Sequence, residues 1–400
     1  MLNNEIVLVT GGSGCIGQHI IKLLIEKKDE LGVKEIRSID LKKYENQIGH
    51  DEFAELKTFV GDVCDLSESA DKIFKGVGTV FHCANLISLQ YPPNLDELYH
   101  VNVDGTQKII ELCLKFNIKN LVYTSCGSVN FLPYKNSTFS IIINQTESKA
   151  LTPVLDNRHK VSPVEFDKGF LIPGYASSKL RAENIVINSC GAKLSNGSDT
   201  LKTVAIRSPI IYGEGDNHFL PPLFKCLASW NNSIPRIGGA GGKHQLVYAG
   251  NVAWGHICAF KTLRDSPKSI AGLPVFITDE TPINDYSRFV QRIGKESNNN
   301  KMKFTHSRWY LPHFLFYFIA FLYETMVRLL YPVLKLQLKY SWRAISSFTS
   351  SVIMFNRLRA EIHINYYPIY SADVAIHQSA KWYGVWYEHN INVGSKSKNK

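Results

Sequence analysis

The sequence lacks paired cysteines. Its eight cysteines are scattered, no two of them form a CxxC pair, and most lie inside apolar runs. Cysteine in such surroundings behaves as a small hydrophobic residue, so we expect neither a disulfide framework nor a zinc or other metal site. Reducing, cytosol-facing conditions suit this pattern, and the four N-x-S/T sequons would then be chance matches to the glycosylation signal.

Signals for nucleic-acid binding and secretion are also missing. The formal net charge is +10, but no basic run is interleaved with aromatic residues, so we expect no nucleic-acid partner. Glu5 interrupts the start, and Ile6–Val9 reads as a buried strand, so no signal peptide is expected. The 400 residues are 44% hydrophobic and 20% charged, which predicts a folded chain with a large core.

No apolar run reaches the length of about 18 residues that is typical of a membrane-spanning helix. The longest candidate lies within 309–338, where Trp309–Tyr323 holds one strongly polar residue, His313, before Glu324 and Arg328 interrupt. Aromatic and basic residues flank this segment. We expect a helix or helical hairpin lying in a bilayer interface. A spanning helix and a buried core or dimer helix remain open alternatives.

Short β-branched runs alternate with helical stretches over the first two-thirds of the chain. This alternation predicts an α/β fold with a doubly wound parallel sheet of the Rossmann type. The expected strands are 6–10, 35–40, 57–60, 79–82, 120–124 and 203–207. The expected helices include 16–30, 95–116, 175–189 and 251–263.

Four regions follow from this pattern. Residues 1–207 form the Rossmann domain, with an insertion at about 127–174 in which 137–148 is expected to form a hairpin. Residues 208–300 form a smaller substrate-binding lobe, with a mobile glycine-rich loop at 238–243. The hydrophobic membrane-associated segment is 301–340, and the C-terminal segment is 341–400.

A glycine-rich turn links the first strand to the first helix. Gly11 permits the tight turn, Gly14 lets the backbone approach a pyrophosphate, and Gly17 allows close helix–strand packing. The helix N-terminus, with Cys15 and Ile16, would face the anion. A strand before the glycines and a helix after them are the context that a dinucleotide site requires.

Acidic residues at strand ends refine the cofactor prediction. Asp40 ends the second strand, where a carboxylate accepts hydrogen bonds from ribose hydroxyls and repels a 2′-phosphate. NAD is therefore preferred over NADP, although Lys42 and Lys43 nearby could soften the preference. Asp62, beside Val63, is placed to meet the adenine edge or to serve as a turn residue. The backbone at Ala84 could line the cofactor, and neighbouring His82 is expected to be packed rather than catalytic.

Tyr175 and Lys179 lie four residues apart at the start of a helix, which places both side chains on one face. An ammonium beside a phenol lowers the pKa of the tyrosine, so Tyr175 would serve as a general base. Lys179 could also hold the nicotinamide ribose. The strand ending in Thr124-Ser125-Cys126 would supply a hydroxyl to hold the substrate oxygen.

These motifs resemble an extended short-chain dehydrogenase/reductase, and within that group the chain is most similar to the 3β-hydroxysteroid dehydrogenase family. The segments that carry the resemblance cover roughly residues 5–290; they are TGGSGCIG, Asp40, FHCAN, VNVDGT, LVYTSC, YASSK, RSPIIYG and LVYAGNVA. The late segments WYLP and PVLKLQ are similar to the related sterol-4-carboxylate 3-dehydrogenases. The resemblance implies that Pro209 shapes the turn beside the nicotinamide.

Two departures from the family pattern stand out. The family places its catalytic serine second in a Thr-Ser-Ser run, and that position is Cys126 here, a weak hydrogen-bond donor. We name Ser125 as the replacement; a replacement by Ser128, poor service by Cys126 itself and reduced activity are the open alternatives. The 48-residue separation between Cys126 and Tyr175 exceeds the family's usual connection, which predicts an insertion at the substrate mouth.

The implied function is NAD-dependent oxidation of a 3β-hydroxysterol to the 3-ketosteroid, with double-bond isomerisation or 4-decarboxylation left open. A cytosol-facing endoplasmic reticulum membrane is expected, with a cytoplasmic location and a homodimer as further options. Two alternatives remain: a sugar-nucleotide epimerase or reductase, for which Arg236 and Arg288 would bind a diphosphate, and a non-catalytic NAD-binding scaffold.

Overall fold

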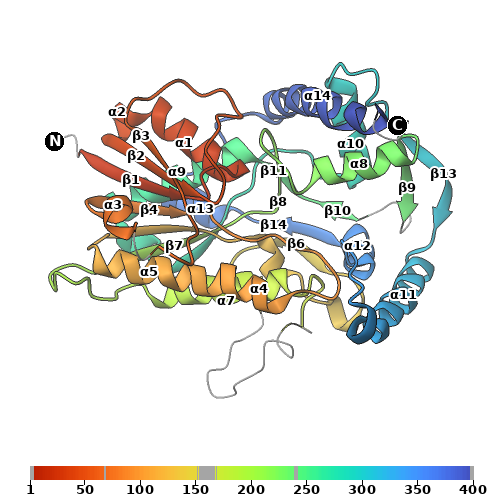
Figure 1. Cartoon of the computed structure of the whole chain (residues 1–400), viewed down its shortest axis with the longest axis horizontal. Helices are drawn as coiled ribbons and strands as arrows, with labels where there is room; N and C mark the ends of the chain where they lie inside the picture. The colour runs from red at the N-terminus through yellow and green to blue at the C-terminus, as the bar shows by residue number, and fades with distance from the viewer. Residues whose placement is uncertain are drawn as a thin grey trace.

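The computed structural model describes residues 4–66, 69–150, 152, 167, 169–237 and 242–396. A seven-stranded parallel sheet forms its centre, in the order β12-β7-β5-β4-β1-β2-β3 (Figure 1). Its strands are β1 (Glu5–Thr10), β2 (Val33–Asp40), β3 (Leu56–Val60), β4 (Val77–His82), β5 (Asn120–Thr124), β7 (Lys202–Arg207) and β12 (Leu273–Phe276). The order reverses between β1 and β4, which is where doubly wound sheets bind ligands.

Helices cover both faces of this sheet. The long helices are α1 (Cys15–Glu26), α5 (Gly105–Lys115), α7 (Tyr175–Asn188) and α9 (Ala249–Asp265). The residues of α1 and α9 share one core with one face of the strands, and those of α5 and α7 share a second core on the opposite face. The inner strands are hydrophobic on both faces because both are covered. These strands hold the glycine-rich turn of Gly11, Gly14 and Gly17, called the cofactor turn below, rigidly at their carboxyl ends.

The six predicted strands are confirmed, each within two residues of its observed bounds. Helix 95–116 is present as α4 (Leu95–Tyr99), a π-helical turn η1 (His100–Asp104) and α5. The first predicted helix is divided into α1 and a short α2 (Lys28–Leu31). The seventh strand, β12, has no counterpart among the predictions, because four residues containing a proline give little strand signal.

The predicted hairpin at 137–148 is wrong. Strand β6 (Ile141–Gln145) pairs in parallel with β14 (Val352–Phe355), which also pairs with β10 (Lys243–His244). The predicted insertion is therefore tied to a segment about 200 residues later in the chain. Its residues 151, 153–166 and 168, and residues 238–241 of the predicted mobile loop, lie outside the described residues.

A smaller lobe follows the sheet. Its elements are β8 (Ile210–Tyr212), α8 (Leu220–Ser229), β9 (Ser233–Ile237), β11 (Leu246–Tyr248), α10 (Tyr286–Glu296), β13 (Thr305–Leu311) and α14 (Ala372–Lys396). Aromatic residues of α8, α10 and α14 pack into one core. In the C-terminal segment, α13 (Leu358–Ile364) joins the core of the main sheet. The remaining elements are α3 (Ala70–Phe74), α12 (Trp342–Thr349) and the 3-10 turns η2 (Gly127–Asn130), η3 (Tyr134–Asn136) and η4 (Pro267–Ser269).

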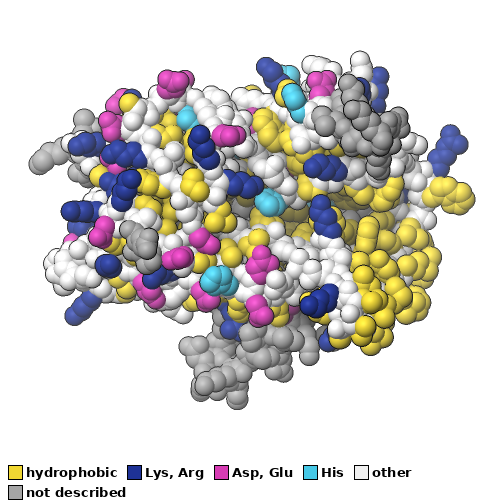
Figure 2. Space-filling model, viewed as in Figure 1, with side chains coloured by type: hydrophobic (Ala, Val, Ile, Leu, Met, Phe, Trp, Pro, Cys, Tyr) yellow, Lys and Arg dark blue, Asp and Glu magenta, His cyan; other side chains and the backbone are white. Residues whose placement is uncertain are grey.

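The hydrophobic segment forms one continuous helix, α11 (His313–Leu334), rather than a hairpin. It is long and apolar enough to cross a membrane, but its buried residues are Ala320, Glu324 and Val327. The alternative of a buried core helix is therefore wrong within this single chain. Its outward side chains form a broad apolar surface on the right of the molecule (Figures 1 and 2).

Candidate active site

One cavity of about 630 Å³ joins the predicted cofactor residues to the predicted catalytic residues. It lies at the carboxyl ends of the central strands, where a doubly wound sheet binds its ligands. The predicted site residues that line it are Gly11, Gly14, Cys15, Ile16, Gly17, Asp40, Asp62, Val63, Ala84, Ser125, Tyr175, Lys179 and Pro209. The topology therefore brings the predicted cofactor and catalytic residues to one cavity, whereas Arg236 and Arg288 are not among its described lining residues.

The glycine turn leaves no room for side chains. A Cβ on Gly11, whose φ is +69°, would lie 2.6 Å from the backbone nitrogen of Ala84. A Cβ on Gly17 would lie 2.2 Å from the carbonyl oxygen of Gly11. Helix α1 begins directly after Gly14 with no side-chain cap, so its first N–H groups face the cavity end of the turn. This arrangement fits a pyrophosphate.

Two carboxylates lie where the sequence predicts the adenosine of the cofactor. Asp40 accepts hydrogen bonds from the backbone N–H groups of Ser13 (3.1 Å) and Lys42 (3.0 Å), which fix its orientation. Asp62 accepts from the N–H of Cys64 (2.9 Å), so it shapes a turn while also lining the cavity. The sequence interpretation did not single out Leu41, which lines the cavity directly after Asp40 and is 67% exposed.

Lys179 is fully enclosed beneath Tyr175. Its Nζ donates to the Thr124 carbonyl oxygen (2.7 Å) and lies 4.3 Å from the centre of the Tyr123 ring. Burial lowers the pKa of Lys179 to about 8. Burial and the neighbouring Cys126 thiol raise the pKa of Tyr175 well above its usual value. The expected lowering of the Tyr175 pKa is therefore wrong, because desolvation by burial has the largest effect on this phenol.

The Ser125 hydroxyl does not point freely into the cavity. It donates to the Glu183 carboxylate at 2.5 Å, and Glu183 also forms a buried ion pair with Arg207. Both charged groups are almost fully buried, so the hydrogen bond from Ser125 satisfies part of a costly buried pair. The predicted catalytic role of Ser125 stays a prediction, and the geometry gives its hydroxyl a structural partner.

Cys126 and Ser128 lie on the cavity side of the same turn. The Cys126 Sγ and Ser128 Oγ atoms are 2.7 Å apart, and the Cys126 thiol also interacts with the Tyr175 hydroxyl. Both residues line the cavity. The thiol and the hydroxyl thus form a polar pair at the position that the family resemblance assigns to serine.

His82 has the packing role that was expected of it. Its ring nitrogens bond to the hydroxyls of Thr10 (2.7 Å) and Thr106 (3.0 Å), and burial lowers its pKa to about 3. No cluster of metal-ligating side chains occurs among the described residues.

The end of the cavity away from the cofactor turn is lined by large apolar side chains. Helix α12 and the segment before it supply Tyr340, Trp342, Ile345 and Phe348, and the lobe supplies Trp230, Ile237 and Tyr286. Neither Arg236 nor Arg288 belongs to the lining within the described part of the chain. Sequence reasoning missed this wall, because nothing local in 340–349 indicates which strand or helix it will face.

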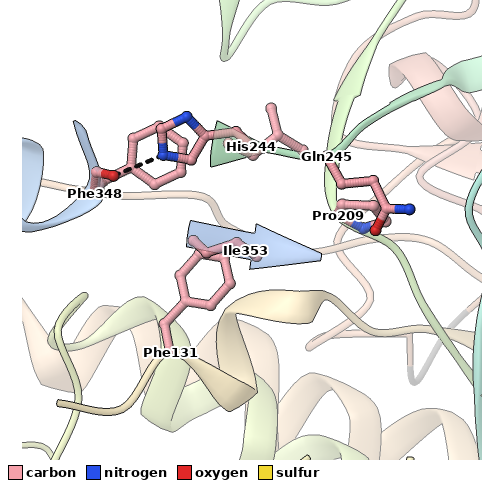
Figure 3. Close-up of a pocket in the computed structure, with 7 residues that line it drawn as sticks. Phe131, Pro209, His244, Gln245, Phe348 and Ile353 are labelled. Carbon is pink, nitrogen blue, oxygen red and sulfur yellow. Dashed lines mark hydrogen bonds between the residues drawn. The ribbon is translucent and has the colours of Figure 1, made fainter. Parts of the chain in front are cut away.

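Figure 3 shows how this wall is braced beside Pro209. The His244 ring stacks on Phe348 with centroids 4.1 Å apart, and its Nε2 donates to the Phe348 carbonyl oxygen at 2.7 Å. Burial lowers the pKa of His244 to about 4, so it is neutral at physiological pH. The His244 ring thus holds Phe348 in place, and the Phe131 ring also stacks against Phe348, with centroids 6.5 Å apart.

The sequence profile of the 3-beta hydroxysteroid dehydrogenase/isomerase family matches residues 8–309. Among solved structures, the chain is similar to MoeE5 in complex with UDP-glucuronic acid and NAD: 16% identity, TM-score 0.63, covering 94% of this chain and 98% of that one. It is also similar to DesIV, a dTDP-glucose 4,6-dehydratase from Streptomyces venezuelae solved with NAD. The identity is 17% and the TM-score 0.64, covering 96% of this chain and 97% of that one. A third similar structure is a UDP-galactose 4-epimerase, with 15% identity and a TM-score of 0.61, covering 95% of this chain and 99% of that one. At these identities the likeness shows a shared fold.

Proposed function

Because the chain belongs to the 3-beta hydroxysteroid dehydrogenase/isomerase family, we propose that it oxidises a 3β-hydroxysterol to the 3-ketosteroid with NAD. The observation that carries the proposal is the apolar far end of the cavity, with its aromatic wall and with no arginine in its described lining. A sterol ring system gains free energy by leaving water for such a surface. A sugar diphosphate would need cationic partners there.

The described residues fit NAD. The glycine turn and the open start of α1 would hold the pyrophosphate, and Asp40 would accept the ribose hydroxyls. NAD, when bound, accepts a hydride from the substrate carbon. The carboxylate of Asp40 disfavours a 2′-phosphate, which supports NAD over NADP.

Tyr175 is the proton acceptor in this proposal. The substrate O–H proton would move to the Tyr175 oxygen once that phenol is ionised, which burial opposes and the Lys179 ammonium favours. The hydride would leave the same substrate carbon, so a carbonyl forms. Lys179 is charged at neutral pH, since its pKa is about 8, and its ammonium stabilises the phenolate electrostatically. We assign the task of holding the substrate oxygen to the Cys126–Ser128 pair, because the Ser125 hydroxyl already has Glu183 as its partner.

A membrane-bound location is part of the proposal. The α11 surface has large exposed hydrophobic side chains, including Phe314, Phe318, Leu322, Leu329 and Val333. Both ends of α11 are fixed to the globular body: His313 bonds to the Ser350 hydroxyl (2.7 Å), and Leu338 pairs with Tyr91. A helix anchored at both ends favours lying flat in the interface over spanning. A cytosol-facing endoplasmic reticulum membrane suits the absence of paired cysteines.

The test is turnover by the detergent-solubilised protein with NAD and a panel of 3β-hydroxysterols, including 4-carboxysterols. NADH and a 3-ketosteroid should form together, and Tyr175→Phe should abolish both. The mass of the product then distinguishes simple oxidation or isomerisation from decarboxylation. The proposal fails if the protein binds NAD but turns over no sterol in the panel.

A sugar-nucleotide reaction on the same fold is the second candidate, favoured by the fold of the epimerase and dehydratase structures. UDP-galactose and dTDP-glucose belong in the same assay. Their conversion, with sterols inert, would replace the sterol proposal. If neither class reacts, an NAD-binding scaffold remains, and Tyr175→Phe should then leave the cellular role of the protein unchanged.

A further inference from the structure

The far end of the cavity and the apolar surface of α11 share the same walls. On one side, α12 presents Ile345 and Phe348 to the cavity, while its Trp342 ring packs edge-on against Phe316 of α11. One helix therefore separates the cavity from α11. Figure 2 shows a hollow beside the apolar surface, lined in part by apolar side chains.

The opposite wall also leads to α11. Strand β9 contributes Pro235 and Ile237 to the cavity and pairs in parallel with β13. Strand β13 carries Trp309, which is 87% exposed, and runs directly into α11. Both sides of the far end are thus continuous with the segment that would contact lipid.

A buried carboxylate ties these walls together. Glu324, fully buried on the inner side of α11, accepts hydrogen bonds from Arg343 Nε (2.6 Å) and from the hydroxyl of Ser341 (2.9 Å). Ser341 caps the N-terminus of α12. The one acidic residue of α11 therefore faces inward and leaves the outer surface without a negative charge.

We propose that the far end of the cavity opens onto the bilayer, so that a lipid-dissolved substrate passes between α12 and β9 without crossing water. The occupant of the α11 surface is the bilayer: Trp309 and Tyr310 precede the exposed helix, and Arg308, Lys335 and Lys339 flank it with positive charge suited to anionic headgroups. The route rests on the membrane placement in the proposed function, but its test does not require turnover.

Cys226 provides a native probe of this route. It lies on α8, is partly exposed and lines the far end of the cavity, whereas Cys64, near the cofactor end, lies outside the cavity lining. The full chain is bound to phosphatidylcholine vesicles with a minor fraction of phosphatidylserine. An alkyl maleimide dissolved in the bilayer is compared with a charged maleimide in the water, and labelling is measured by mass spectrometry of peptides.

We expect the bilayer reagent to label Cys226 faster than Cys64, and Phe318→Glu/Leu322→Glu to slow the Cys226 reaction about tenfold or more, because charges on this face oppose insertion. The matched control, Ile362→Glu/Val374→Glu, adds the same charges to exposed hydrophobic positions on α13 and α14 and should change nothing.

Equal labelling of Cys226 in both variants, or labelling by the charged reagent alone, would overturn the route. So would a dimer that forms through α11 and does not bind vesicles, measured by sedimentation. If the labelling pattern holds while no sterol is oxidised, the route stands and the sterol proposal fails.

Discussion

At the carboxyl end of β2, two backbone N–H groups hold the Asp40 carboxylate in place. Removing it in Asp40→Ala should lower the ratio of kcat/KM for NAD to that for NADP by about ten- to a hundredfold, because the repulsion of a 2′-phosphate is lost. Lys42 remains nearby to attract that phosphate. Steady-state kinetics with both cofactors measures the ratio, and an unchanged ratio would remove Asp40 from cofactor selection.

Cys126 offers a second test at the scale of single residues. Cys126→Ser replaces a weak donor by a hydroxyl beside Tyr175 and should raise kcat several-fold, whereas Ser128→Ala should lower it about tenfold. Ser125→Ala is the matched control. Loss of this hydroxyl leaves the Glu183 carboxylate short of a donor, so the main effect should be a lower Tm rather than a lower kcat. If Ser125→Ala alone abolished turnover of a folded enzyme, our assignment would be reversed.

Between elements, the contact of α11 with α12 depends on the carboxylate of Glu324. Glu324→Ala should lower the free energy of unfolding by about 3 kcal/mol, because Arg343 and Ser341 lose their partner in a partly buried site. Denaturation in urea measures this loss. Glu361→Ala, in the more exposed pair with Arg357, is the control and should cost less than about 1 kcal/mol. Equal costs would show that Glu324 does not anchor α12.

Which elements the sequence predicted depends on how local their cause is. The β1 strand, the glycine turn and α1 follow one another directly, so Gly11, Gly14 and Gly17 stand in the strand–turn–helix context that identifies a dinucleotide site. Tyr175 and Lys179 are equally local, since four residues on a helix fix their common face. The direction of the Ser125 hydroxyl depended on Glu183 and Arg207, which no local spacing connects to it.

The apolar wall of the cavity could not be predicted from the sequence either, because it also depends on contacts between residues that are distant in the sequence. The pairing of β6 with β14 and the stacking of His244 on Phe348 join residues more than 100 positions apart. The apolar character of residues 309–338 was evident from the sequence. The inward direction of the Glu324 side chain was not, because it depends on where α12 packs. Tertiary contacts decided each of these outcomes.

For the whole molecule, three of the histidines that are buried in the described part of the chain predict sensitivity to acid. Burial lowers the pKa of His82 to about 3 and that of His244 and His256 to about 4, while in the unfolded chain each titrates near its ordinary value of about 6.5. Below that value the unfolded chain binds more protons, so stability is lost as pH falls from about 6.5 toward 4.

Each of these histidines contributes a slope of up to about 1.4 kcal/mol per pH unit within its window. His256→Gln should therefore flatten the dependence of the free energy of unfolding on pH between about 4.5 and 6.5. His389→Gln on the exposed end of α14 is the control and should leave the slope unchanged. An identical slope in both variants would mean that other groups dominate the acid response.

The small sheet β10-β14-β6 also orders the assembly of the molecule in time. The strands that surround the cofactor turn are complete by Phe276, whereas β6 must wait for β14, some 200 residues later, before it gains a partner. Contacts this distant in sequence form late and slowly. During synthesis, a nascent chain can thus fold its dinucleotide half first. Its substrate half then forms only when the last quarter of the chain leaves the ribosome.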